Sequence, residues 1–347
     1  MKVAYVALDP LKYPRVKKIA YSLKKHHFFQ LHVMLPMIQF ASRGNKMKRL
    51  VYAIIKYAIV LLQIFFVRSD IFWVANCPDI LALPLILRGK RYILEYRSPW
   101  PSDVEREFGS GSLVRLAAIV EDFALKHASL ITLTTSKLMV KIKDFGKPVF
   151  VIPNYPLEKF GVLSVSRREF RRRCDCRDED KVVLYVGRLT RAGGGDLLPR
   201  IMENVLERAD VVFWIVGDGP LYPLLEEFGK RFPKQVRLFG WQSYEEIPNF
   251  VAAADVCIEP LHSSTSSFFY NEEGVQKLSE YMFFEKPIVA CGVAKSDEYL
   301  LVDEDGMADG ILKALNGMVR LSRRRTWEDH SEKKIYEMFS LIQSIET

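Results

Sequence analysis

The sequence predicts two α/β domains in succession, each built on a parallel sheet covered by helices. Its 347 residues exceed one ordinary domain and suit two of about 150–180 residues each. Short runs of β-branched and aromatic residues alternate with longer helical stretches, a pattern typical of such sheets. Hydrophobic residues make up 49% of the chain and charged residues 27%, which leaves apolar material for two cores. Repeats of about 20–50 residues, the mark of solenoids and propellers, are absent from the sequence.

The predicted strands fall into two sets. In the first half they are Lys2–Leu8, Gln30–Leu35, Asp70–Ala75, Tyr92–Tyr96, Leu130–Thr134 and Val149–Ile152. In the second half they are Val182–Val186, Val211–Val216, Val236–Phe239, Val256–Ile258 and Ile288–Ala290. Two sets of this size predict two Rossmann-like domains. Because such sheets bind ligands outside the carboxyl ends of their strands, we expect the active site in a cleft between the domains.

A stretch rich in proline and charge separates the two sets. Pro153-Asn154-Tyr155-Pro156 is followed by the run 167–173, in which five of seven residues are arginines. This composition is typical of a linker. We therefore expect an N-terminal domain over 1–160 and a C-terminal domain over 161–325.

The N-terminus and the cysteines indicate a cytoplasmic protein. Residues 1–7 are typical of a first strand, whereas a signal peptide needs a basic start and a longer apolar run. The five cysteines are scattered, which suits a reducing compartment better than a disulfide framework. Cys174 and Cys176 are the only close pair, and no second cluster supplies further zinc ligands. We expect no metal site.

The positive charge is concentrated near the N-terminus. Residues 1–70 contain thirteen basic residues and two acids, Asp9 and Asp70, a net charge of +11. The whole chain carries +8, so the other 277 residues sum to −3. This asymmetry favours an anionic partner, either a membrane surface or a phosphate-bearing acceptor. Nucleic acid is not expected, because basic residues interleaved with stacking aromatics in a known binding motif are absent.

The segment 47–67 predicts an almost entirely apolar helix. Arg49, Lys56 and Gln63 are seven residues apart and form one narrow polar stripe. A membrane span needs about 20 apolar residues with few charges, so this helix is a poor candidate for one. Two alternatives stay open and are compatible: a crossover helix packed in the core, or an interfacial helix whose basic residues reach lipid headgroups. Peripheral binding at the inner face of the membrane therefore remains an option.

The strand Val182–Val186 leads into a glycine-rich turn. Gly187 and Arg188 follow it, and Gly193, Gly194 and Gly195 come next. Such a turn before a helix presents free backbone N–H groups to an anion, and arginine is a good donor to phosphate. Gly217 follows the next strand and lets a ligand approach the backbone. The alternative is an ordinary tight turn without a ligand.

A second element joins acids, a glycine and a lysine around a helix start. Glu272 and Glu280 lie eight positions apart, and Gly274 lies between them where a loop turns into a helix. A carboxylate inside the helix can accept both hydroxyls of a ribose, and one in the loop can accept hydroxyls of a sugar. The N–H groups of Val275 and Gln276 would face a diphosphate, with Lys277 adding positive charge. The alternative is a pair of acids on a solvated helix face.

Together these motifs resemble a known family. The segment from about 180 to 300 resembles the donor domain of retaining GT-B glycosyltransferases of glycosyltransferase family 4. The matching motifs are Gly187-Arg188-Leu189, Gly217-Asp218-Gly219-Pro220, the Glu272/Glu280 element, and Pro287-Ile288-Val289-Ala290. The first half resembles the acceptor domain more loosely, through Asn76-Cys77-Pro78-Asp79, Arg97-Ser98-Pro99-Trp100 and Val151-Ile152-Pro153-Asn154.

The resemblance implies the GT-B fold and a role for each candidate residue. Glu280 would hold the donor ribose, Glu272 the hydroxyls of the transferred sugar, and Arg188 and Lys277 would neutralise the departing diphosphate. Arg188, Lys277 and Glu272 are thus the catalytic candidates. The donor-binding candidates are Gly187, Gly193, Gly217, Gly274, Val275, Gln276 and Glu280. Arg97 and Asp103 are the acceptor-side candidates, and the last helix, about 326–347, would return to the N-terminal domain.

Two positions depart from the family pattern. The family usually has a lysine about five residues after the arginine, where this chain has Gly193, and Arg191 is the residue that can replace it. The first strand usually leads into a glycine-bearing loop, but Leu8-Asp9-Pro10-Leu11 contains no glycine.

The expected activity is transfer of a hexose-type sugar from a nucleoside-diphosphate donor to a hydroxyl of a sugar or lipid-linked acceptor, as in glycan biosynthesis. Retention of configuration follows from the resemblance. No cofactor or metal is expected, because fixed cations can meet the leaving-group charge and no acid cluster for a hard metal accompanies the motifs. A GT-B epimerase or phosphorylase, an oxidoreductase without the full dinucleotide fingerprint, and a non-catalytic membrane-surface protein are the alternatives. The Glu272/Glu280 element favours the transferase.

Overall fold

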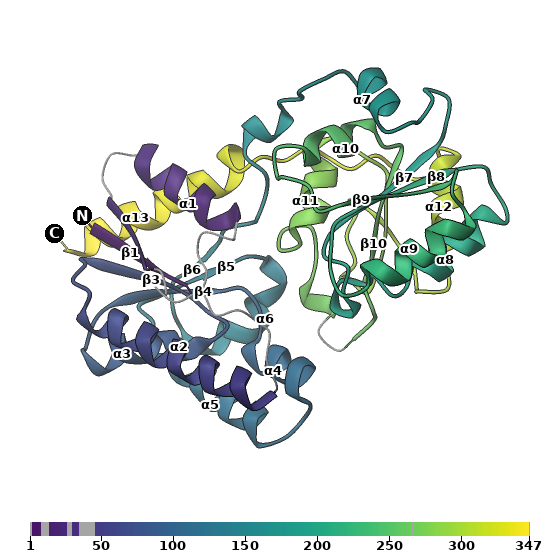
Figure 1. Ribbon diagram of the computed structural model, residues 1–347. Coiled ribbons are helices and arrows are strands. Elements are labelled where there is room, and N and C mark those ends of the chain that lie inside the picture. Colours follow the sequence, from purple (N-terminus) through teal and green to yellow (C-terminus); the bar gives the residue numbers. More distant parts are fainter. Residues whose placement is uncertain (1, 8–13, 26–29, 35–45, 265–266, 347) are drawn as a thin grey trace. The chain divides into compact units, whose positions relative to one another are not determined.

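The protein, seen here in a computed structural model, is described over residues 2–7, 14–25, 30–34, 46–264 and 267–346. For 30–34, 46–54, 56, 106–108 and 345–346 only the backbone is described. The chain divides into two compact units (Figure 1): Met1–Pro153 with Ser331–Thr347, and Asn154–His330. The first segment of the first unit thus ends at Pro153, where the sequence suggested 160, and its second segment begins at Ser331. The loop 8–11 that departs from the family pattern lies outside the described residues.

The first unit is built on a six-stranded sheet in the order β2-β1-β3-β4-β5-β6, with each neighbouring pair parallel. Its strands are β1 (Lys2–Val6), β2 (Gln30–Met34), β3 (Ile71–Ala75), β4 (Tyr92–Tyr96), β5 (Leu130–Leu133) and β6 (Val149–Val151). All lie where the sequence predicts them. Strands β3 and β4 are buried along their whole length, as expected of parallel strands covered on both faces.

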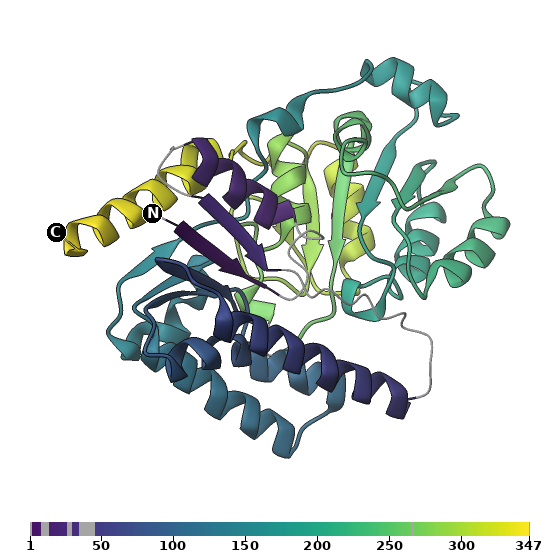
Figure 2. The same ribbon diagram turned by 60° about the vertical axis from the view of Figure 1, so that its left-hand side comes forward.

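Helices cover both faces of this sheet (Figures 1 and 2). They are α1 (Pro14–Lys25), α2 (Lys46–Phe66), α3 (Leu83–Leu87), α4 (Trp100–Phe108), α5 (Ser112–His127), α6 (Met139–Ile142) and α13 (Lys333–Glu346). On one face lies α13, whose Phe339 ring contacts that of Trp73 at 6.0 Å between centroids. On the other face lies α5, where the carbonyl of Ala124 accepts a hydrogen bond from the Tyr92 hydroxyl at 2.5 Å. Helices α2 and α3 share that second face and contact each other.

Helix α2 confirms the predicted helix and bears on its two open alternatives. Val60 and Ile64 are buried in the core, whereas Leu62 is 58% and Phe66 73% exposed. The helix therefore contributes to the core along one side and presents apolar side chains along another. In the described part of the chain, none of the helices combines the length and apolar character needed to cross a membrane. The side chains of Lys46, Lys48 and Arg49 lie outside the described residues.

The second unit has a six-stranded sheet in the order β12-β11-β10-β7-β8-β9, again with parallel neighbours. Its strands are β7 (Val182–Val186), β8 (Val212–Val216), β9 (Val236–Gly240), β10 (Val256–Pro260), β11 (Ile288–Cys291) and β12 (Leu300–Leu301). Only β12, two residues long, was not predicted. The chain proceeds outward from β7 to β9 and then returns to β10, beside β7. The carboxyl ends of β7 and β10 therefore form the topological switch point where such folds bind ligands.

Two cores cover the faces of this sheet, because successive side chains of a strand point to opposite faces. The helices are α7 (Arg167–Arg173), α8 (Leu198–Leu206), α9 (Tyr222–Arg231), α10 (Ile247–Ala253), α11 (Gln276–Phe283) and α12 (Met307–Leu315). Leu184 and Trp214 pack with α7, α10 and α11. Tyr185 and Phe213 pack on the opposite face with α8, α9 and α12.

The arginine-rich run expected as a linker is instead helix α7 of the second unit. Arg171 is fully buried and donates to the carbonyls of Ala253 and Asp180 and to the carboxylate of Asp255. A buried guanidinium needs this number of acceptors, because an unpaired buried charge is very costly. The interpretation of this run as a linker was wrong, because composition does not reveal which arginine points inward.

Candidate active site

At the candidate site, the residues that follow β7 and β8 are joined to neighbouring strands by backbone hydrogen bonds. The N–H of Gly187 donates to the carbonyl of Val216 at 2.9 Å, and that of Gly217 to Gly240 at 2.8 Å. Gly217 has φ +143, and a Cβ atom there would lie 1.8 Å from the carbonyl oxygen of Gly187. Gly217 therefore stands where two strand ends approach too closely for a side chain, whereas a Cβ atom on Gly187 would crowd the side chains of Lys277 and Tyr185 at 3.0 Å.

The glycine-rich turn after β7 is closed by its own hydrogen bonds. The N–H of Gly193 donates to Thr190 at 3.1 Å, that of Gly194 to Arg191 at 3.0 Å, and that of Gly195 to Thr190 at 2.9 Å. Gly194 has φ +73, and a Cβ atom there would lie 1.4 Å from the carbonyl oxygen of Pro260. The expectation of free N–H groups was therefore wrong for these three glycines, because each N–H is bonded within the turn. Gly194 also packs against β10.

The two arginines near the turn are exposed. Arg188 follows Gly187, and among the described residues its guanidinium has no partner. Its backbone carbonyl accepts a hydrogen bond from the hydroxyl of Tyr185 at 3.2 Å. The side chain of Arg191 is 84% exposed and lies 3.7 Å from Asp196. Arg188 is thus a free cation beside the switch point, while Arg191 points toward an acid.

Lys277 is held at the end of β7 by two other side chains. Its Nζ lies 2.8 Å from Oε2 of Glu259, on β10, and 4.7 Å from the ring centre of Tyr185. A Cβ atom on Gly187 would lie 3.0 Å from the same Nζ. Burial alone would lower the pKa of Lys277, but Glu259 and the Tyr185 hydroxyl outweigh it and hold that pKa above its ordinary value.

The two predicted glutamates are buried, so they do not lie on a solvated helix face. Glu272 lies in the turn before α11 and is 6% exposed, and among the described residues its Oε2 has no hydrogen-bond partner. Burial raises the pKa of Glu272, although a hydrogen bond from Ser296 acts against it. Glu280, on α11, is 4% exposed and accepts from Nε2 of Gln276 at 2.6 Å.

The start of α11 differs in one respect from the expected phosphate site. The N–H groups of Gly274 and Val275 both donate to the carbonyl of Asn271, at 3.1 and 2.8 Å. The expected role of the Val275 N–H was therefore wrong, because the loop already uses it. Gln276 contributes its side chain to Glu280 instead.

The acceptor-side candidates lie at the carboxyl end of β4 in the first unit. Arg97 Nη2 lies 3.0 Å from Oε2 of Glu95 and also contacts the hydroxyl of Tyr5. Asp103, on α4, accepts from the hydroxyl of Ser98 at 2.8 Å. Glu95 is fully buried, and although burial raises its pKa, Arg97 and Arg15 lower it to about 2. Arg97 therefore belongs to a buried ion cluster that joins β1, α1 and β4.

Several polar groups near these sites were not singled out from the sequence. Glu259 and Glu95 are single acids inside otherwise apolar buried strands, a signal that could have been read. Asp79, noted only for its resemblance, is fully buried, and neither carboxylate oxygen has a partner among the described residues. Burial raises its pKa well above the ordinary value.

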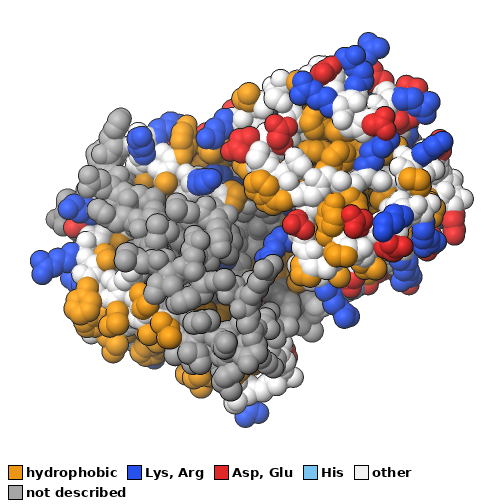
Figure 3. Space-filling model, viewed as in Figure 1, with side chains coloured by type: hydrophobic (Ala, Val, Ile, Leu, Met, Phe, Trp, Pro, Cys, Tyr) orange, Lys and Arg blue, Asp and Glu red, His pale blue; other side chains and the backbone are white. Residues whose placement is uncertain are grey.

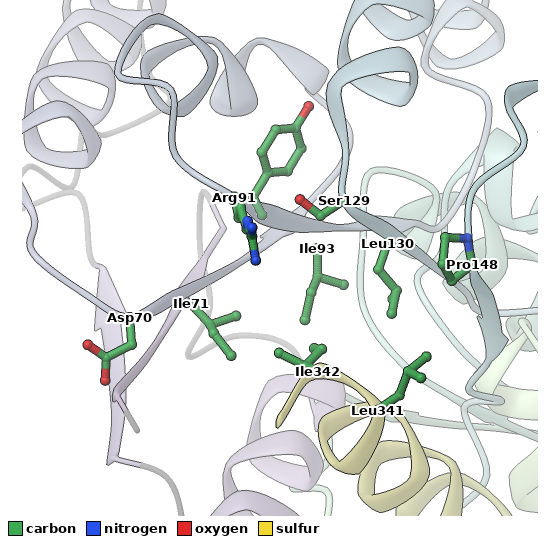
Figure 4. A pocket seen from close by; sticks show the side chains of 10 residues that line it. Asp70, Ile71, Arg91, Ile93, Ser129, Leu130, Pro148, Leu341 and Ile342 are labelled. Carbon is green, nitrogen blue, oxygen red and sulfur yellow. The ribbon is translucent and has the colours of Figure 1, made fainter. Parts of the chain in front are cut away.

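One pocket of the first unit contains none of the candidate residues. Its volume is about 220 Å³, and its lining includes Ile71, Ile93, Leu130 and Leu341 (Figure 4). These residues start strands β3, β4 and β5 or belong to α13, so the pocket lies at the amino edge of the sheet. Arg97 and Asp103 lie toward the opposite, carboxyl edge.

Comparison with known proteins assigns the second unit. Residues 180–317 match the family model described as "Glycosyl transferases group 1". An uncharacterized glycosyltransferase of Methanocaldococcus jannaschii is 33% identical over 95 residues, 26% of this chain and 24% of that protein. The alpha-monoglucosyldiacylglycerol synthase of Acholeplasma laidlawii is 23% identical over 175 residues, 48% and 44% of the two chains. The chain thus spans less than half the length of these curated relatives.

Solved structures identify the fold of the whole chain. Sucrose-phosphate synthase from Thermosynechococcus elongatus superposes with a TM-score of 0.71 at 15% identity, covering 99% of both chains. Anabaena HepE, crystallised in complex with UDP-glucose, gives a TM-score of 0.67 at 16% identity over 98% of this chain and 100% of that one. The chain therefore has the GT-B fold, as predicted. Its second unit carries a group 1 glycosyltransferase domain.

Proposed function

We propose that the protein transfers a sugar from a UDP-sugar to a hydroxyl of an acceptor. The observation that carries the proposal is the buried Oε2 of Glu272, which has no hydrogen-bond partner among the residues described and lies eight positions before the buried Glu280. A buried acceptor left without a donor costs roughly 1–3 kcal/mol, a cost that a ligand hydroxyl removes. Structures of a protein of the same fold in complex with UDP and with UDP-glucose support uracil as the base of the donor.

The division of roles follows from the chemistry of a departing diphosphate. Negative charge grows on the leaving group while the sugar acquires oxocarbenium character, and fixed donors meet that charge best. Two cations would meet this charge: Arg188, whose side chain is exposed, and Lys277, whose ammonium is paired with Glu259. Glu280 receives the ribose hydroxyls and Glu272 the hydroxyls of the transferred hexose.

We further propose that transfer proceeds with retention and without a metal. No side chain is assigned as a nucleophile, and same-face attack assisted by the leaving phosphate agrees with the family resemblance. Among the described residues, no group of three or more His, Cys, Asp or Glu is arranged to hold a metal ion. The cations of the chain itself would then supply the electrostatic stabilisation.

A thermal-shift panel of UDP-, GDP-, ADP- and TDP-sugars tests the donor. A ligand at a hundred times its Kd stabilises the folded state by about 2.7 kcal/mol, so the correct donor must raise the Tm. We expect UDP-sugars to raise it most. A panel in which none raises the Tm contradicts the proposal. Analysis of products separates transfer, which yields a glycosylated acceptor, from an epimerase or phosphorylase, which yields an epimer or a free sugar phosphate.

A second proposal concerns the acceptor and rests on an exposed apolar face of the first unit. Helices α2, α3 and α5 lie on one face of the sheet and present large apolar side chains outward, visible over α2 and α3 in Figure 3. They include Leu62, Phe65, Phe66, Leu87, Leu113, Leu116, Ile119 and Phe123, which we call the apolar face. Exposed basic residues accompany them at Arg68, Lys90, Arg91, Arg115 and Lys126.

We propose that the apolar face binds an anionic lipid surface. Large exposed apolar patches mark interaction sites, and basic residues beside them match the negative charge of a membrane. The acceptor would then be a lipid or a lipid-linked glycan. The name of the Acholeplasma relative, a glucosyldiacylglycerol synthase, supports a lipid acceptor.

A further inference from the structure

Glu259 is a charged residue in an otherwise apolar, buried strand. It lies on β10 and is fully buried, and the other residues of the strand have apolar side chains. Apart from the contact with Lys277, neither of its carboxylate oxygens has a hydrogen-bond partner among the described residues. Buried ion pairs of this kind add little net stability compared with apolar side chains of similar volume. The pair therefore calls for another explanation than stability.

The place of the ammonium group suggests one. Lys277 Nζ lies against the Tyr185 ring and beside Gly187, at the carboxyl end of β7. This end adjoins that of β10, the switch point of the sheet. The side chain of Lys277 is 19% exposed whereas that of Glu259 is 1% exposed, so the lysine is the member of the pair that reaches toward solvent.

Besides Arg188, the glycine-rich turn offers little to bind a phosphate in the part of the chain that the structure describes. The N–H groups of Gly193, Gly194 and Gly195 are used within the turn. Arg191 is 84% exposed and lies near Asp196. A lysine fixed from α11 would supply the compact cation that the turn itself does not carry.

We infer that Glu259 is a positioning residue, which holds the Lys277 ammonium at the end of β7 where the donor diphosphate binds. The inference rests on the proposed function, because it takes a nucleoside diphosphate as the ligand. Glu259 does not touch the donor and acts only through Lys277. Glu259 would fix the direction of one N–H of the ammonium before the ligand binds. The flexible lysine side chain would then lose less conformational entropy on binding the diphosphate.

Charge and position predict effects of opposite sign. Glu259 and Lys277 together carry no net charge, so removing the carboxylate adds one positive charge to the site. If charge alone mattered, Glu259→Gln would tighten the binding of an anion. If position matters, the same change weakens binding, because the ammonium loses its fixed place. Glu259→Asp separates the two again, since it keeps the charge and withdraws the carboxylate by one methylene.

Calorimetry with UDP and with uridine tests the inference. We expect Lys277→Met to weaken UDP at least tenfold and uridine less than twofold. Glu259→Gln and Glu259→Asp should each weaken UDP about fivefold and leave uridine unchanged. The double variant Glu259→Gln with Lys277→Met should bind UDP no more weakly than Lys277→Met alone. Glu304→Gln is the control, because Glu304 is a half-buried acid of the same unit that contacts His262 instead.

The outcomes are distinct. Tighter UDP binding by Glu259→Gln, unchanged UDP binding by Glu259→Asp, or equal losses for UDP and uridine would overturn the positioning role while the proposed function stands. A wild-type protein that binds none of UDP, GDP, ADP and TDP overturns the proposed function and this inference together. Thermal unfolding of each variant shows which are folded. Should Glu259→Gln not fold, Glu259→Asp, which keeps the ion pair charged, carries the test.

Discussion

The hydroxyl of Tyr96 lies 3.1 Å from Oε1 of Glu121 and donates a hydrogen bond to it. The N–H of Trp100 donates to the same oxygen at 2.8 Å. Burial nevertheless raises the pKa of Glu121 to about 7. The carboxyl of Asp79, another buried acid, interacts with Glu121 and has a raised pKa as well. Two acids thus share a buried region near the carboxyl ends of β3 and β4.

This arrangement predicts a pH-dependent stability. Between the ordinary pKa of a glutamate, about 4.3, and about 7, the folded protein holds a proton that the unfolded chain has released. The contribution of Glu121 is therefore fully present below about pH 4 and is lost as the pH rises through 7. Urea unfolding between about pH 5 and pH 8 should show Glu121→Gln gaining stability relative to wild type as the pH rises. A difference that stays constant over this range would contradict the raised pKa.

The two glutamates of the donor site should fail in different ways. Glu280→Gln is expected to weaken both UDP and the UDP-sugar about tenfold or more, because hydrogen bonds to a charged group contribute roughly 1.5–3 kcal/mol. Glu272→Gln should leave UDP binding within about twofold and reduce turnover about a hundredfold, as for a group that acts in the transition state. Calorimetry and steady-state kinetics measure both. Equal losses of UDP affinity in the two variants would end this division of roles.

Transfer should survive chelation. If Arg188 and Lys277 meet the charge of the leaving diphosphate, saturating EDTA leaves the rate nearly unchanged. Arg188→Ala, by contrast, should lower kcat about a hundredfold with the fold intact, since the side chain is exposed. Loss of activity in EDTA that manganese or magnesium restores would replace this account with a metal-dependent one.

Membrane binding should depend on the apolar face and on anionic lipid. We expect sedimentation with phosphatidylglycerol vesicles but not with phosphatidylcholine vesicles, and release as salt is added. Phe66→Gln with Leu87→Gln should abolish binding, and glutamine at Lys46, Lys48 and Arg49 should weaken it by about 1 kcal/mol per charge near the lipid. The matched control is Leu224→Gln with Met318→Gln, which removes exposed apolar side chains from the second unit. If the Phe66→Gln, Leu87→Gln variant still binds vesicles and the control variant does not, the membrane-binding surface lies in the second unit and this proposal fails.

Two glycines with nearly the same positive φ should tolerate alanine very differently. Gly194 and Gly317 have φ +73 and +72, so alanine costs about 1–2 kcal/mol at either from conformation alone. At Gly317 no atom lies within 4 Å of the new Cβ, whereas at Gly194 it would lie 1.4 Å from the carbonyl oxygen of Pro260. We expect Gly194→Ala to lose at least about 2 kcal/mol more than Gly317→Ala in urea unfolding. Equal losses of unfolding free energy in the two variants would show that β10 can move away from the new methyl group at little cost.

The fold could be predicted because most of its strands are short apolar runs, and several of those described are buried along their whole length. Val182–Val186 and Tyr92–Tyr96 are each bounded as the sequence predicts, since parallel strands covered on both faces leave a continuous apolar run. Strand β12 was missed, because two residues leave no pattern. The sequence also indicated which glycines matter, but not why. The contact that requires a glycine at position 194 is with Pro260, which is far away in the sequence.

The site was readable only in part, for the same reason. Glu272 and Glu280 share one loop and helix, so their spacing carries information. Lys277 on α11 pairs with Glu259 on β10, and Glu95 on β4 pairs with Arg15 on α1 as well as with the nearby Arg97. Local sequence says which residue types are present but not which pairs the topology brings together, and burial of Arg171 was hidden in the same way.

The helix α13 sets an order in which the protein can assemble during synthesis. Its buried residues Ile335, Met338 and Phe339 complete the face of the first sheet that carries Trp73. These residues leave the ribosome only after all of Asn154–His330, the entire second unit, has been made. The later unit in the chain is thus the first to have every residue it needs, whereas domains generally fold from the N-terminus onward. Until this helix has been made, the nascent first unit lacks the Phe339 ring that packs against Trp73.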